Sequence, residues 1–141
     1  MTLQRAIRVA AREARTFAGR VYRSQAEMRM ARWLEAGDAL EIHYEPKLML
    51  GDEPYRPDFF VVKPDYSFYV EVKAMRRTPV RFSRGKRVEP KWKYVNAAQR
   101  ERMRRITRLW AKYGPAPLQI WTVARETLVH VKTIEGGTIS Q

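Results

Sequence analysis

The chain contains no cysteine, and none of its apolar runs approaches the roughly 18 residues that a membrane-spanning helix needs. The first absence excludes disulfides, thiolate metal sites and cysteine nucleophiles. Residues 1–18 carry four arginines with no apolar block between them, so we expect no signal peptide. Together these absences predict a cytoplasmic protein that makes no membrane contact.

Acidic residues are also scarce, with 15 Asp and Glu against 28 Lys and Arg in 141 residues, a net charge of +13. The charge is unevenly placed: residues 1–32 carry +6, residues 33–73 carry −5 and residues 74–112 carry +12. A basic excess of this size favours a polyanionic partner such as nucleic acid, although a solvated surface is the alternative. An acidic middle between two basic segments is what a metal site inside a phosphate-binding surface would need.

The length fits one domain with a real core, and the 45% apolar content is ordinary for a globular protein. Residue patterns predict helices at 3–17, 24–36 and 93–113 and strands at 40–44, 48–50, 56–63, 67–74, 118–123 and 128–134. The basic stretch 76–91, interrupted by Pro and Gly, reads as a mobile loop. This order predicts an α/β or α+β fold in which helices flank a central mixed sheet. We expect a basic N-terminal helix in residues 1–19 and the main domain in residues 20–141.

The strongest chemical signal is a pair of acids and a lysine on one predicted hairpin. A turn centred at residues 64–65 would set Asp58 opposite Glu71, with Lys73 two residues further along the same face. Adjacent carboxylates repel each other, and a divalent cation between them is the simplest resolution. Oxygen ligands favour magnesium or manganese over zinc. The alternative is a salt bridge to Lys73, and a register slip of one residue would separate the two acids.

Glu27 is a candidate third acid, because it shares the apolar stripe of its helix with Met30 and Leu34. A carboxylate on a buried face needs a partner. The alternative is local, since Ser24 and Glu27 have the spacing of a capping box, in which the glutamate only closes the start of its helix.

These residues resemble the motif of the PD-(D/E)xK nuclease superfamily: a helix glutamate, Pro57-Asp58, and Glu71-Val72-Lys73 occur in the right order. More narrowly, residues 20–124 resemble archaeal-type and phage Holliday-junction resolvases. The resemblance implies a single restriction-endonuclease-like domain that acts as a homodimer, in the host cytoplasm if a phage encodes it. It also implies magnesium-dependent endodeoxyribonuclease activity on four-way DNA junctions, in DNA recombination and repair, with manganese able to substitute.

The resemblance also assigns roles to individual residues. Asp58 and Glu71 would bind magnesium, with the Val72 carbonyl as a further ligand. Glu27 would bind or position a second metal or its water. Lys73 would orient or activate the attacking water and stabilise the charge that develops on the phosphate.

The helix that follows the basic stretch supplies one further candidate, Gln99, which the resemblance places near the site; a solvent-facing role is the alternative. DNA contacts are expected on the basic stretch itself, where Trp92 could stack on a base. The expected contact residues are Arg76, Arg77, Arg81, Arg84, Lys86, Arg87, Lys91, Trp92 and Lys93. Two other functions stay open: a different nuclease of the superfamily acting on duplex or branched DNA, and a DNA-binding protein without catalysis.

Overall fold

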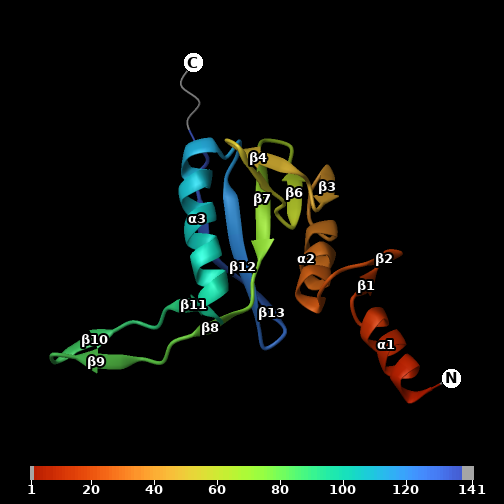
Figure 1. The fold of residues 1–141 in the computed structure, drawn as a ribbon, viewed down its shortest axis with the longest axis horizontal. Coiled ribbons are helices and arrows are strands. Elements are labelled where there is room, and N and C mark those ends of the chain that lie inside the picture. The colour runs from red at the N-terminus through yellow and green to blue at the C-terminus, as the bar shows by residue number, and fades with distance from the viewer. Residues whose placement is uncertain (1, 138–141) are drawn as a thin grey trace.

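The computed structural model describes residues 2–137 (Figure 1). Residue 1 and residues 138–141, which belong to the two expected domain ranges, lie outside the described residues. The described elements are α1 (Leu3–Glu13), β1 (Thr16–Phe17), β2 (Arg20–Val21), α2 (Gln25–Glu35), β3 (Glu41–Tyr44), β4 (Leu48–Leu50), β5 (Glu53–Tyr55), β6 (Phe59–Val62), β7 (Ser67–Val72), β8 (Met75–Arg77), β9 (Arg81–Ser83), β10 (Lys86–Val88), β11 (Trp92–Tyr94), α3 (Ala97–Tyr113), β12 (Leu118–Ala124) and β13 (Thr127–Ile134). No helix among them is long and apolar enough to cross a membrane.

A five-stranded sheet in the order β13-β12-β7-β6-β3 forms the centre of the molecule, with β7 in the middle. The β7–β12 pair is parallel, and the other three pairs are antiparallel. Helices α2 and α3 flank this sheet (Figure 1). The expected α/β class with a central mixed sheet is therefore confirmed.

The two faces of the sheet have separate cores because side chains alternate along each strand. Phe59, Val61 and Val70 pack with the apolar stripe of α2 on one face. Tyr69 packs with Ile106 and the rest of the α3 core on the other. The register between β6 and β7 sets Phe59 opposite Val70 and Phe60 opposite Tyr69, as the turn at residues 64–65 predicts.

Three expected elements need correction. Helix α1 ends at Glu13 and not at residue 17, because residues 16–21 form a small hairpin whose turn has Ala18 and Gly19 at positive φ. Helix α3 begins at Ala97 and not at residue 93, because Asn96 caps its start and the preceding residues form β11.

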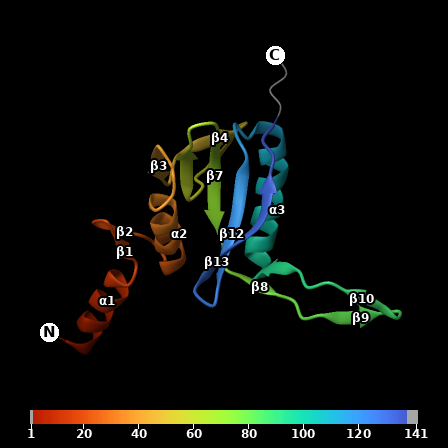
Figure 2. The same cartoon turned by 180° about the vertical axis from the view of Figure 1, so that it is seen from behind.

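The third correction concerns residues 76–91, which are not a loop. They lie in a two-stranded ribbon made of β8–β11 and β9–β10, and this ribbon projects from the body on the side away from α1 (Figures 1 and 2). The prolines and the many charges concealed the β-forming residues Val80, Phe82 and Val88 from pattern analysis.

Trp110 fixes α3 against the sheet. Its side chain is fully buried, its Nε1 donates to the carbonyl oxygen of Ala116 at 2.8 Å, and its ring meets Tyr55 and Tyr69 edge-on with centroids 6.0 and 5.2 Å apart. We expect Trp110→Ala to lower the free energy of unfolding by about 3–5 kcal/mol in urea titrations, because it leaves a large cavity. Trp33→Ala is the matched control, since Trp33 is 49% exposed. Equal losses in the two variants would contradict this packing.

Candidate active site

Asp58 lies directly before β6 and is tied to β7 twice. Its backbone N–H donates to the carbonyl oxygen of Val70 at 3.0 Å, and its Oδ2 accepts a hydrogen bond of 2.6 Å from the N–H of Val72. Pro57, directly before it, is fully buried, and its ring restricts the backbone φ angle at the entry to this strand. The Asp58 side chain is held against the strand that carries Glu71, and only 3% of the residue is exposed.

Glu71 lies in the centre of the sheet on β7 and is 2% exposed. Its Oε1 accepts a hydrogen bond of 2.7 Å from the hydroxyl of Tyr55. Its Oε2 lies 3.3 Å from Nζ of Lys73, yet it has no hydrogen bond of good geometry within the described residues. One oxygen of this carboxylate is thus held in place while the other is only paired by charge.

Burial dominates the electrostatics of the pair. It raises the pKa of Asp58 to about 8, and the negative charge of Glu71 is the next largest cause. Burial also raises the pKa of Glu71, against the opposing effect of Lys73 and Tyr55. Without a bound cation, the pair therefore holds a proton at neutral pH.

Glu27, on α2, is buried with 6% of its surface exposed. Its Oε1 accepts from the hydroxyl of Tyr44 at 2.8 Å, and its Oε2 accepts from the hydroxyl of Ser24 at 3.1 Å. Ser24 in turn caps α2 by accepting from the Glu27 N–H at 3.1 Å. The Glu27 carboxylate therefore bonds the hydroxyl that caps α2 and not the Ser24 backbone N–H of a capping box, and its charge also acts on Asp58.

Arg23 links the acids of α2 and of the hairpin, a role that the sequence did not reveal. Its Nε lies 2.7 Å from Glu45 and 3.8 Å from Glu27, and its Nη2 lies 3.4 Å from Asp58. The Arg23 side chain is 65% exposed, so its guanidinium is open to solvent while it contacts these acids. The only signal in the sequence was its position four residues before Glu27, a spacing typical of helical ion pairs.

Tyr44 and Tyr55 were also missed as parts of the site. No motif in the sequence marks either residue, yet each donates its hydroxyl to a buried carboxylate. Buried acids need donors, but spacing alone does not show which residues supply them. Tyr55 reaches Glu71 from β5, which pairs with β4 outside the central sheet.

The donor set fits a hard divalent cation. Asp58 and Glu71 offer oxygen atoms, one Glu71 oxygen lacks a hydrogen bond, and the buried pair needs positive charge. In residues 2–137, no group of three or more His, Cys, Asp or Glu side chains is arranged to hold a metal ion. The fit therefore rests on the Asp58–Glu71 pair, and metal binding by Glu27 and by the Val72 carbonyl stays a prediction.

Gln99 lies in the first turn of α3, where its N–H donates to the Oδ1 of the capping Asn96 at 2.8 Å. Its side-chain oxygen is buried and lacks a hydrogen bond among the described residues, as does the hydroxyl of Tyr94. This burial disfavours the solvent-facing interpretation of Gln99. Burial and then the charge of Glu71 raise the pKa of Tyr94, so its hydroxyl lies within electrostatic reach of the carboxylate.

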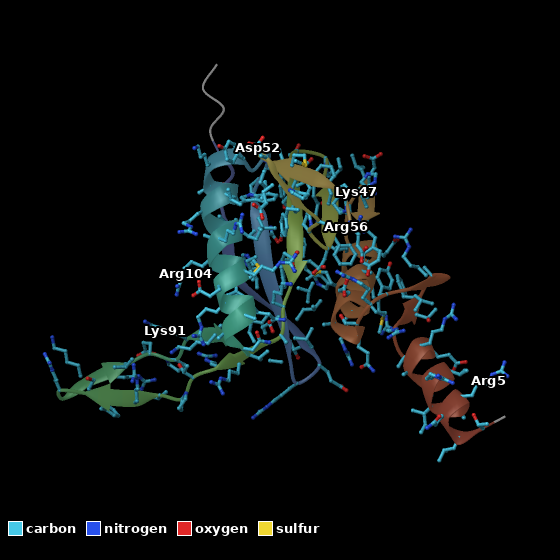
Figure 3. The ribbon with its side chains drawn as sticks, viewed as in Figure 1. Arg5, Lys47, Asp52, Arg56, Lys91 and Arg104 are labelled. Carbon is cyan, nitrogen blue, oxygen red and sulfur yellow. The ribbon has the colours of Figure 1, made fainter. Side chains whose placement is uncertain are left out.

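The nine expected DNA-contact residues all lie in or beside the ribbon, which starts two residues after Lys73. Trp92 pairs with Arg77 across the ribbon, and the guanidinium of Arg77 lies 6.0 Å from the centre of the indole ring. Trp92 thus already has a cation on its face. Figure 3 shows Lys91 at the ribbon and Arg104 on α3, while Lys47 and Arg56 lie on the body near the β-sheet.

Comparisons with protein-family models, curated proteins and solved structures give no match to this chain. The resemblance to PD-(D/E)xK nucleases thus stays a prediction from the sequence motif.

The raised pKa of Asp58 has a consequence for stability. Its unfolded value is 3.8 and its folded value about 8, so the folded state gains stability below pH 4 and loses it as the pH rises toward 8. We expect Asp58→Asn to be more stable than the wild type at pH 9 in EDTA, by on the order of a few kcal/mol in urea titrations.

Asp38→Asn is the control with opposite sign, because Lys63 lowers the pKa of exposed Asp38. This variant should gain no stability at high pH. An Asp58→Asn protein that is less stable than the wild type at pH 9 would contradict the conclusion that burial raises the pKa of Asp58.

Proposed function

We propose that this chain is a magnesium-dependent endodeoxyribonuclease of the PD-(D/E)xK type that cuts four-way DNA junctions. One observation carries the proposal: Asp58 and Glu71 are buried side by side on one hairpin, in the predicted register, with Lys73 against them. A buried acid pair that needs a cation, inside a chain of net charge +13, suits the hydrolysis of a polyanion.

Asp58 and Glu71 would hold the magnesium ion, which supplies charge neutralisation at the phosphate and a water of lowered pKa. The protein keeps both carboxylates oriented, since the Val72 N–H holds Asp58 and the Tyr55 hydroxyl holds Glu71. Loading the site requires loss of the proton that the pair holds at neutral pH. Magnesium binding to the pair is therefore expected to strengthen as the pH rises toward 8.

Lys73 is the residue proposed to act on the attacking water. Its side chain is 20% exposed, so the ammonium contacts Glu71 and still reaches solvent at the edge of the site. There it would orient the water and stabilise the negative charge that develops on the phosphate. Glu27 would position a second metal or its water, and Gln99 would approach the site from α3.

Junction DNA and a homodimer belong to the proposal through the resemblance, as does the restriction-endonuclease-like fold. Resolving a junction needs two symmetric cuts, which a two-fold dimer supplies directly. The sequence has no evident base-reading motif, and this favours recognition of DNA shape. A recombination or repair role follows from that substrate.

A DNA-binding protein without catalysis is the second candidate, and one observation favours it. Arg23 lies 3.4 Å from Asp58 and Lys73 lies 3.3 Å from Glu71, so protein cations already meet both carboxylates. In that case the cluster is a structural salt bridge, and DNA binding persists with no magnesium or manganese site. The exposure of Arg23, which leaves its guanidinium accessible to a phosphate, favours the nuclease.

We expect Asp58→Asn, Glu71→Gln and Lys73→Ala each to slow magnesium-dependent cleavage of a synthetic four-way junction by at least about 100-fold, because each removes a metal ligand or the cation beside the water. Junction binding in calcium should survive. Asp38→Asn, which alters an exposed ion pair away from the site, should cut like the wild type. Variants of the three site residues that cut as fast as the wild type would overturn the assignment.

Substrate choice separates junction resolution from the other nuclease activities. At equal salt, we expect a four-way junction to be cut at least about 10-fold faster than a flap or a linear duplex of the same sequence, measured as single-turnover rates. Equal rates on all three substrates would contradict junction selectivity and favour a duplex or repair nuclease.

A further inference from the structure

Residues 75–94 form one long hairpin made of two antiparallel segments, β8–β11 at its base and β9–β10 at its tip, which follow the same register. Arg76 lies opposite Lys93 at its base, and Phe82 lies opposite Arg87 near its tip. Between them, Thr78 is bonded to Lys91, with the Thr78 N–H donating to the Lys91 carbonyl at 2.8 Å and the Lys91 N–H donating to the Thr78 hydroxyl at 2.8 Å. The tip turns at residues 84–85, both at positive φ, as a two-residue hairpin requires.

The same register places Pro79 opposite Pro90. Neither proline has an N–H to give to the ladder, so the ribbon is interrupted at one level on both strands. Below this level, β11 contacts α3 and β8 contacts β12. Above it, every residue of β9 is exposed. The proline pair therefore separates a base that contacts the body from a tip whose β9 residues are all exposed.

This tip carries features that need a partner. Phe82 is 71% exposed and Val80 is 44% exposed. Cations lie on both faces of the ribbon, because residues directly opposite each other share a face and neighbours along a strand alternate. At the base, Arg76 and Lys93 share one face and Arg77 lies on the other. At the tip, Arg81 and Lys86 share one face, and Arg87, which pairs with Glu89, lies on the other. A membrane or another flat anionic surface would meet only one of these faces, whereas a DNA groove has phosphates on both sides.

The width and the length of the ribbon both fit the major groove of B-DNA. The major groove of B-DNA, about 12 Å wide, admits a two-stranded ribbon, and its base edges include thymine methyl groups that an apolar side chain can contact. From Met75 to the turn at Arg84 the strand advances by roughly 30 Å, at about 3.3 Å per residue. That is close to one turn of B-DNA, roughly 34 Å.

We propose that the 75–94 ribbon lies in the major groove of a duplex arm beside the cut, with cations of both faces on the two phosphate backbones and Phe82 on the base edges about one helical turn away. The position relative to the cut rests on the proposed nuclease function. The groove contact itself does not, because it depends only on the ribbon.

Binding to a labelled four-way junction and to a 30-base-pair duplex is measured for the full chain in calcium, across a salt series. Arg81→Ala/Lys86→Ala should lower the slope of log affinity against log salt by roughly 1.8, at about 0.9 for each phosphate that the protein no longer neutralises. Phe82→Ala should weaken binding severalfold and leave the slope unchanged, because it removes no charge. Lys112→Ala, an exposed cation in the last turn of α3, should change neither quantity.

Dimethyl sulfate footprinting provides the positional readout. Wild type should protect guanine N7, a major-groove atom, about one turn from the cut, and the double variant should lose this protection. Unchanged slopes in the double variant, or protection confined to the minor groove, would overturn the proposal. So would variants that dissociate a dimer in sedimentation while binding DNA normally, since a second copy would then occupy the tip. If the ribbon effects appear but the wild type never cuts DNA, the nuclease proposal fails and the groove contact stands.

Discussion

The site depends on one unfavourable arrangement, the burial of two carboxylates side by side on the β6–β7 hairpin. Asp58 and Glu71 are 3% and 2% exposed. Two ionised carboxylates at that depth repel each other strongly, because little water is present to screen their charges. The protein offsets this cost with donors from separate elements. Val72 binds Asp58 from the adjacent strand, Tyr55 binds Glu71 from β5, and Arg23 approaches from the start of α2.

The central position of β7 fixes Glu71 and connects the acid pair to the basic ribbon. As the central strand, it is paired with β6 on one side and with β12 on the other, so Glu71 is fixed from both sides. The chain then leaves the sheet at Lys73 and becomes the first strand of the basic ribbon within two residues. Glu71, which would hold a metal, and the cations proposed to hold DNA therefore follow one another along the chain. The position of the strand that carries Glu71 fixes where the ribbon starts.

Sequence reasoning succeeded where the structure is local. The hairpin register followed from a short turn and from strict alternation on two strands, and the cap at Ser24 followed from its spacing to Glu27. It failed where partners are distant: nothing near Tyr55 indicates that its hydroxyl meets Glu71, and Arg23 joins acids from three separate parts of the chain. The ribbon was missed for a different reason, because prolines and dense charge are usual in loops, and only the constant register shows that Pro79 faces Pro90.

The proposed function requires that the Asp58–Glu71 pair be a metal site that exchanges a proton for a cation. The most direct measurement is calorimetric titration of the protein with manganese at pH 7, in buffers of different ionisation enthalpy, for the wild type and Glu71→Gln. We expect saturable binding by the wild type with release of about one proton per metal, and loss of that binding in Glu71→Gln. A wild-type protein that binds no manganese, or a variant that binds it equally well, would contradict the metal site.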